Sequence, residues 1–191
     1  MVRGKIGDKK VAIYQAALRR VNKNGYGGLT MQELAKDAKL ATGTVYLYFE
    51  NKEDLVNELI INTKEEMVDA IYDGLDLEEP LFPFFKKMVS NYLEYGINNL
   101  DKIIFLEQFY RSEFITSQTK LALTEIWEPF RNQLISPKNE MLLKDGNRDL
   151  MLKNFEGGIN QIIKTIKEHN LVYNKLMRDQ ILDVLWCSIR R

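Results

Sequence analysis

Cysteine, histidine and long apolar runs are scarce in this chain of 191 residues, and each scarcity excludes a class of protein. The single Cys187 cannot form an intramolecular disulfide, which is typical of a reducing compartment. The single His169 has no companion at the spacing of a metal or nucleophile site, and no glycine-rich phosphate loop is present. No apolar run approaches the roughly 20 residues of a membrane span. Residues 1–8 lack the apolar core of a signal peptide. We therefore expect a cytoplasmic protein with no catalytic residues, metal, cofactor or membrane partner.

Proline is also rare, at four residues, whereas leucine, isoleucine, lysine, glutamate and asparagine fill long stretches of the chain. The chain is 45% hydrophobic and 28% charged, which is ordinary for a globular protein and argues against disorder. Neither strand-like alternation nor an internal repeat is visible. The composition and pattern predict an all-α fold.

Caps and apolar periodicity divide the chain into about nine helices. Gly25 is placed to end the first helix, and Thr30 with Glu33 has the spacing of a capping box at the start of the second. Pro129 should kink or break a long helix that Thr116 caps. The predicted helices span about 8–24, 30–38, 41–48, 51–73, 80–98, 101–110, 116–134, 147–168 and 174–190.

Residues 30–52 are typical of a helix-turn-helix, in which two short helices meet at a tight turn. The second helix is too short, and too polar on one face, to be ordinary core. That face carries groups that can hydrogen-bond phosphates and base edges, whereas Val45, on the other face, belongs with Leu34 and Phe49 in the core. This arrangement presents a recognition helix to the major groove of DNA.

The net charge of zero hides an asymmetry along the chain. Residues 1–50 carry nine basic and four acidic side chains, whereas the remaining residues carry 18 and 23. A basic N-terminal part on an acidic body suits a protein whose N-terminal part alone meets a polyanion. A chance fluctuation on solvated surfaces is the alternative, so charge by itself does not decide.

This segment resembles the N-terminal domain of the tetracycline-repressor (TetR) family of bacterial transcriptional regulators. The matching positions are Ile13, Ala16, Ala17, Leu18, Gly25, Tyr26, Thr30, Leu34, Ala35, Ala38, Gly43, Thr44, Val45, Tyr46, Tyr48, Phe49, Lys52 and Leu55. The rest of the chain matches by length and helical architecture only. The resemblance implies a helix-turn-helix DNA-binding domain over residues 1–52 and a helical ligand-binding and dimerisation domain over 53–191.

The resemblance also implies which residues contact DNA. It places Gln32, Thr42, Gly43 and Tyr46 at base edges, and Thr30, Thr44, Tyr48 and Lys52 at phosphates. Half-buried packing between helices is the alternative for Tyr46 and Tyr48. Family members usually have glycine in the turn where this chain has Lys39. A left-handed backbone at Lys39 would cost on the order of 1 kcal/mol, so Lys39 either contacts a phosphate in compensation or belongs to a slightly different turn.

Twelve of the twenty aromatic residues lie within residues 72–130. In the family the corresponding helices enclose a small-molecule pocket, which implies an apolar or aromatic effector. Nearby glutamates could bind a cationic effector, and Lys86, Lys87 and Arg111 an anionic one such as a fatty-acyl group. Plain core is the alternative for each aromatic residue. The implied pocket residues are Phe85, Tyr92, Tyr95, Phe105, Phe109, Tyr110, Trp127 and Phe130.

The last two predicted helices resemble the family's dimerisation pair. Their apolar residues would form a four-helix interface with a two-fold mate, and an intramolecular core is the alternative. Two recognition helices about 34 Å apart would then read a palindrome. The implied interface residues are Ile181, Leu182, Leu185, Trp186 and Ile189, with Leu171 and Leu176 nearby.

Together these features predict a homodimeric repressor that binds a palindromic double-stranded DNA operator and is released by a small-molecule effector. Three alternatives stay open. The protein could be a DNA-bound adaptor that recruits a protein without an inducer, a helical carrier or enzyme with a vestigial N-terminal domain, or an activator.

Overall fold

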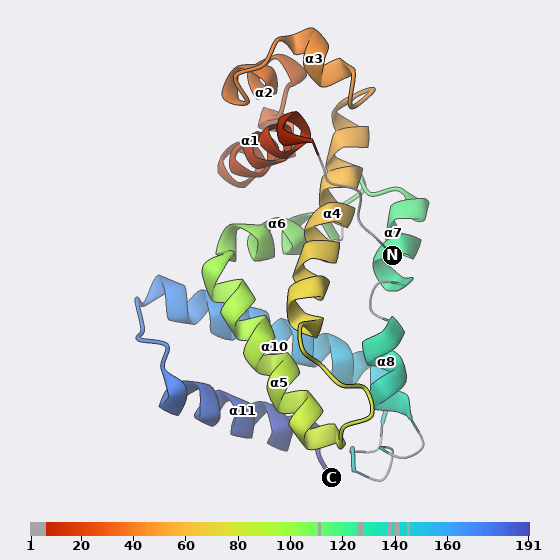
Figure 1. Cartoon of the computed structure of the whole chain (residues 1–191), viewed down its shortest axis with the longest axis vertical. Coiled ribbons are helices and arrows are strands. Elements are labelled where there is room, and N and C mark those ends of the chain that lie inside the picture. Colours follow the sequence, from red (N-terminus) through yellow and green to blue (C-terminus); the bar gives the residue numbers. More distant parts are fainter. Residues whose placement is uncertain (1–6, 111, 126–127, 137–138, 140–141, 145) are drawn as a thin grey trace. The chain divides into compact units, whose positions relative to one another are not determined.

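The computed structural model is built from helices throughout the residues that it describes, which are 7–110, 112–125, 128–136, 139, 142–144 and 146–191 (Figure 1). In these residues there are ten α-helices, one short 3-10 helix and a single isolated bridge between Leu143 and Arg190. The predicted all-α fold is therefore confirmed. The side chains of Tyr110, Pro129, Phe130, Leu134, Ile135 and Arg148 are not described.

The helix bounds follow the predicted segments closely. They are α1 (Asp8–Asn24), η1 (Tyr26–Gly28), α2 (Met31–Asp37), α3 (Thr42–Tyr46), α4 (Lys52–Tyr72), α5 (Leu81–Asn98), α6 (Leu100–Tyr110), α7 (Ser117–Glu125), α8 (Glu128–Ile135), α10 (Arg148–Glu168) and α11 (Lys175–Ile189). The long helix predicted over 116–134 is described as α7 and α8, and residues 126–127 between them lie outside the described residues. Pro129 falls in the first turn of α8, where its missing N–H is not needed.

Side-chain oxygens begin several of these helices. The Thr30 hydroxyl accepts a hydrogen bond from the Glu33 backbone N–H at 3.3 Å at the start of α2. Asn51 does the same for Asp54 at the start of α4, at 2.8 Å. Thr116 caps α7, as predicted, and Asn147 and Asn174 cap α10 and α11. These short polar residues fix where each helix starts because they satisfy backbone donors that have no partner within the helix.

The chain forms two compact units. The first comprises the described residues up to Lys64 together with Asp101–Ala122, and the second comprises Glu65–Leu100 with the described residues of Leu123–Arg191. Because α4 is one uninterrupted helix, it contributes residues to both units. This division by compactness differs from the predicted functional boundary after residue 52, which stays a prediction.

In the first unit, α2 packs against both α1 and α3, and the Tyr14 hydroxyl of α1 donates to the Glu58 carboxylate of α4 at 2.9 Å (Figure 1). Leu34, Val45 and Phe49 are almost fully buried, with exposed fractions of 0%, 0% and 1%, as their predicted structural role requires. The inner face of α1 is formed by Ile13, Ala17 and their helical neighbours, and Val11 is exposed.

In the second unit, α5 packs against both α10 and α11 (Figure 1). The approach of α5 to α10 is close at Gly96, where a Cβ atom would collide with the side chain of Ile163. Phe85 of α5 contacts Phe155 of α10, with ring centroids 5.5 Å apart, and Trp186 of α11, at 5.0 Å. The core of this unit is therefore built around an aromatic cluster.

Candidate nucleic-acid interface

The turn between α2 and α3 has the backbone conformation that glycine usually provides. Lys39 has a φ of 57°, in the left-handed region, and the Leu40 N–H donates to the Ala35 carbonyl at 2.9 Å. The turn therefore does not differ from the one that a glycine would form. Lys39 adopts the left-handed backbone in spite of its strain. The Lys39 side chain is exposed, so its ammonium group is available to a polyanion.

Two buried side chains hold α3 in place and leave its other face in solvent. Val45 and Phe49 face the core, and the Phe49 ring lies 5.8 Å from that of Tyr14. Tyr46 is 53% exposed and Tyr48 is 38% exposed. Both tyrosines therefore present part of their ring to solvent, and half-buried packing between helices stays the alternative for both.

Gly43 stands on this exposed face, and the fold itself does not require a glycine there. A Cβ atom at Gly43 would meet no described atom within 4 Å, and the residue does not have a left-handed backbone. Because Gly43 has no side chain, the helix backbone is uncovered on the outer surface at this position. A partner can therefore approach the backbone of α3 more closely at Gly43 than at positions that carry a side chain.

The start of α2 is fixed to α1 by a charged network. Arg20 of α1 binds Glu33 through Nη1 at 2.8 Å and Asp37 through Nη2 at 2.7 Å. The Thr30 hydroxyl, a predicted phosphate ligand, also donates to the Glu33 carboxylate at 3.2 Å. Gln32 is exposed beside this network, and Thr42 and Thr44 are partly exposed on α3.

Lys52, another predicted phosphate ligand, lies over an aromatic ring of its own chain. Its Nζ atom is 4.3 Å from the ring centroid of Tyr26, and Tyr26 stacks on Phe114 with centroids 3.8 Å apart. Burial and the neighbouring Glu53 carboxylate raise the pKa of Tyr26 to about 12. The lysine is therefore held by a cation–π contact, and its position is linked to the connection between α6 and α7.

Sequence reasoning missed Asn57, a buried amide in α4 that binds this same connection. Its Nδ2 atom donates to the carbonyls of Glu53, at 2.8 Å, and Phe114, at 3.0 Å, while its Oδ1 accepts from the Thr116 N–H at 3.1 Å. An asparagine inside a helix gives no signal of such a role, because Phe114 and Thr116 lie more than fifty residues away. A second amide, Asn22 of α1, donates to the Asp101 carbonyl at 2.7 Å.

The predicted pocket residues fall into two groups. Phe85, Tyr92 and Tyr95 belong to the second unit and Phe105 and Phe109 to the first, and all five are buried. Trp127 lies outside the described residues, as do the side chains of Tyr110 and Phe130. In the second unit, the Tyr92 hydroxyl donates to Oδ1 of the buried Asn160 at 2.9 Å, a polar pair joining α5 to α10.

The predicted dimer residues also fall into two groups, one buried within the protomer and one partly exposed. Leu182, Leu185 and Ile189 are buried within their own unit, where α11 packs on α5, so the alternative of an intramolecular core holds for these three. The Trp186 ring contacts Phe82 and Phe85, and Ile181 is partly exposed. Other apolar side chains, in the first turn of α10, in the connection to α11 and on α11, are exposed: Leu150, Leu171, Val172, Leu176 and Val184.

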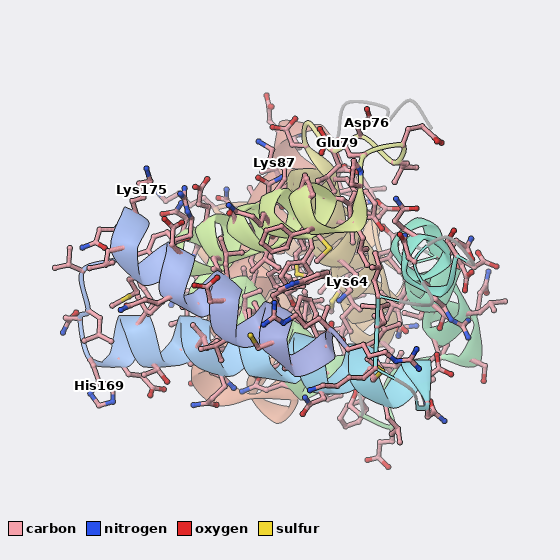
Figure 2. All side chains as sticks on the ribbon, turned by 90° about the horizontal axis from the view of Figure 1, so that it is seen from below. Lys64, Asp76, Glu79, Lys87, His169 and Lys175 are labelled. Atoms are coloured by element: carbon pink, nitrogen blue, oxygen red, sulfur yellow. The ribbon has the colours of Figure 1, made fainter. Side chains whose placement is uncertain are left out.

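The described residues contain no cluster of three or more residues that could hold a metal ion. His169 lies at the outer end of α10, where the chain turns toward Lys175 and α11 (Figure 2). Among the described helices, none is both long and apolar enough to cross a membrane.

The helix-turn-helix geometry agrees with a family match. Residues 13–59 match the family model for bacterial regulatory proteins of the tetR family. This segment of the chain therefore matches the DNA-binding part of the TetR family. An uncharacterized HTH-type transcriptional regulator of Haemophilus influenzae is 32% identical over 79 residues, which are 41% of this chain and 42% of that protein. The fatty acid metabolism regulator protein of Bacillus subtilis is 42% identical over 67 residues, 35% of this chain and 34% of that protein.

The matches to these curated relatives thus span less than half of their length, while solved structures resemble nearly the whole chain. A tetR family transcription regulator from Shewanella sp. PV-4 has a TM-score of 0.85 and 21% identity, covering 97% of this chain and 100% of that one. FadR from Bacillus subtilis in complex with stearoyl-CoA has a TM-score of 0.67 and 22% identity, covering 94% and 98%. At these identities the likeness is one of fold. The relatives matched over this segment are transcriptional regulators.

Proposed function

We propose that this TetR-family protein is a cytoplasmic, ligand-responsive repressor that binds a palindromic operator as a homodimer. The observation that carries the proposal is the outer face of α3. It combines an open position at Gly43 with the exposed hydroxyl-bearing ring of Tyr46, on a helix anchored by the buried Val45 and Phe49. A short helix with this division of faces is suited to the major groove.

DNA binding would use two kinds of contact. Gln32, Thr42, Gly43 and Tyr46 would lie at base edges, and Thr30, Lys39, Thr44, Tyr48 and Lys52 would lie near phosphates. The exposed side chain of Lys39 fits a phosphate contact, which would offset its backbone strain. Lys52 would act from its position over the Tyr26 ring.

A second copy of the chain would pair through α10 and α11. The exposed Leu176 and Val184 lie two helical turns apart on α11, with exposed fractions of 68% and 67%. Burying such side chains against a two-fold mate is favourable by about 25 cal/mol for each Å² of apolar surface. The interface we now propose therefore differs from the predicted set, because three of those residues are already buried in the protomer.

The effector would be a small apolar or aromatic molecule that enters the aromatic interior of the helical body. Because α4 contributes residues to both units, a shift of its C-terminal part can displace α3. To lower operator occupancy about a hundredfold, the effector must favour the released state by about 2.7 kcal/mol. The Asn57 amide and the Tyr26 stack would make α6 and α7 move with the first unit.

The DNA-binding part is tested with the full chain and a duplex selected from a random-sequence pool. Fluorescence anisotropy should show that Tyr46→Ala weakens binding at least tenfold, since a base contact contributes about 1–3 kcal/mol. The control variant Tyr46→Phe keeps the ring and separates the contribution of the hydroxyl group. Wild-type affinity in Tyr46→Ala would contradict the assignment of α3.

The effector part is tested on the same complex with stearoyl-CoA, the molecule bound in the FadR neighbour, and with a cationic aromatic dye as the contrasting probe. Release of the duplex by one of the two probes supports a ligand-responsive regulator and identifies the charge class. Retention of the duplex with both probes at saturating concentration would favour the adaptor alternative.

A further inference from the structure

Leu47 is an exposed apolar residue in the part of the molecule proposed to meet DNA. It is 83% exposed, the largest exposed fraction among the large apolar side chains of the described residues. It directly follows α3 and keeps a helical backbone, with φ of −72° and ψ of −20°. Val45 and Phe49 supply the buried contacts of this segment, so the fold of the protomer gains nothing from an apolar side chain at residue 47.

Gly43 lies one helical turn before Leu47 and therefore on the same face. Helical side chains lean toward the N-terminal end of their helix, so the Leu47 side chain leans toward the turn that holds Gly43 without covering it. At Gly43 the surface is bare backbone, with no described atom within 4 Å of the place where a Cβ would stand. The outer face of α3 thus presents an apolar group beside an open position.

The chemistry of Leu47 restricts what it can recognise. A leucine side chain cannot hydrogen-bond a phosphate or the polar edge of a base. In the major groove the apolar feature of the four standard bases is the C5-methyl group of thymine. We propose that Leu47 is a specificity-determining residue that reads a thymine through its C5-methyl group. This inference rests on the proposed function, because it requires that α3 enters the major groove.

The experiment replaces thymine by deoxyuridine, which lacks only the methyl group and keeps every hydrogen-bonding atom. A duplex is first selected from a random-sequence pool with the wild-type full chain, and each thymine is then replaced in turn. At one thymine of each half-site, wild-type Kd should rise about fourfold, as expected for one buried methyl group of about 0.8 kcal/mol. Replacements at other thymines should leave Kd unchanged.

The matched variants are Leu47→Ala and Leu121→Ala, since Leu121 is also an exposed leucine, at 61%, in the first unit. Leu47→Ala should bind the thymine and deoxyuridine duplexes equally at that position, whereas Leu121→Ala should keep the fourfold difference. Leu47→Met retains an apolar group and should keep a preference for thymine. Thermal melting followed by circular dichroism should be the same for all variants, because both leucines are exposed.

The outcomes separate this inference from the proposed function. If the wild-type chain selects no duplex and binds none at low salt, the proposed function fails. If it selects a duplex but no thymine replacement changes Kd, or if Leu47→Ala keeps the fourfold difference, the assignment of Leu47 is overturned and the proposed function stands.

Discussion

The tyrosines of the recognition segment in the first unit face solvent, whereas the aromatic residues of α5 in the second unit face inward. Tyr46 and Tyr48 are 53% and 38% exposed, but Phe85 and Tyr92 are only 1% and 3% exposed. The difference follows from the number of packing partners. α3 is five residues long and buries only Val45, while α5 is eighteen residues long and packs against both α10 and α11. An aromatic residue is therefore a surface group or a core group according to what its helix packs against.

Both units join segments that are distant in the sequence by amide hydrogen bonds and by ring contacts. In the first unit, Asn57 binds the backbone of Phe114 and Thr116, and Tyr26 stacks on Phe114. In the second unit, Gln133 donates to the Leu77 carbonyl at 2.6 Å, and the Phe85 ring packs against Phe155 and Trp186. Hydrogen bonds depend on direction and position, whereas apolar packing depends mainly on buried area. Variants of the two kinds of contact therefore test different contributions to stability.

The largest expected effect tests the aromatic cluster. Phe85→Ala should lower the free energy of unfolding by about 3–5 kcal/mol, because it removes a fully buried ring and leaves a cavity. Chemical denaturation followed by circular dichroism measures this loss. The matched control is Phe82→Ala, one turn earlier in α5, which is 41% exposed and should lose clearly less. Equal losses for the two variants would contradict the expectation that the buried Phe85 contributes more to stability than the exposed Phe82.

A smaller effect is expected from the amide contacts of the first unit. Asn57→Ala should lower the free energy of unfolding by about 1–3 kcal/mol, because the Phe114 carbonyl and the Thr116 N–H lose their buried partner. Denaturation of Asn154→Ala provides the control, since Asn154 is an exposed asparagine within α10. That variant should be unchanged or slightly stabilised by the better helix propensity of alanine. A stable Asn57→Ala protein would show that the amide does not hold the connection between α6 and α7.

The smallest effect is expected at the turn before α3. Lys39→Gly should raise the free energy of unfolding by up to about 1 kcal/mol, because glycine adopts the left-handed backbone without strain. If Lys39 contacts a phosphate, the slope of log affinity against log salt should also fall by about one unit. In contrast, Lys36→Gly, within α2, should lower the free energy of unfolding by about 1 kcal/mol. A change in the free energy of unfolding of the same sign for both variants would contradict the proposed backbone strain at Lys39.

Much of the fold could be predicted from local signals. Gly25, Thr30 and Thr116 mark helix ends through their own backbone freedom or side-chain caps, and the structure confirms these positions. The predicted recognition helix extended to residue 48, whereas α3 ends at Tyr46, because periodicity does not locate the final turn of a short helix. The contacts of Tyr26 and Asn57 gave no comparable signal, since both depend on a segment near residue 114.

The sequence by itself determined the helical class, the helix-turn-helix and the face of α3 that is buried, because spacing and capping act within a few residues. Only the tertiary structure decided which apolar residues are core. It showed Leu182, Leu185 and Ile189 buried within the protomer and Leu47 exposed beside Gly43. The physical reason is that apolar residues have the same chemistry at any position, and their burial depends on which helices pack together.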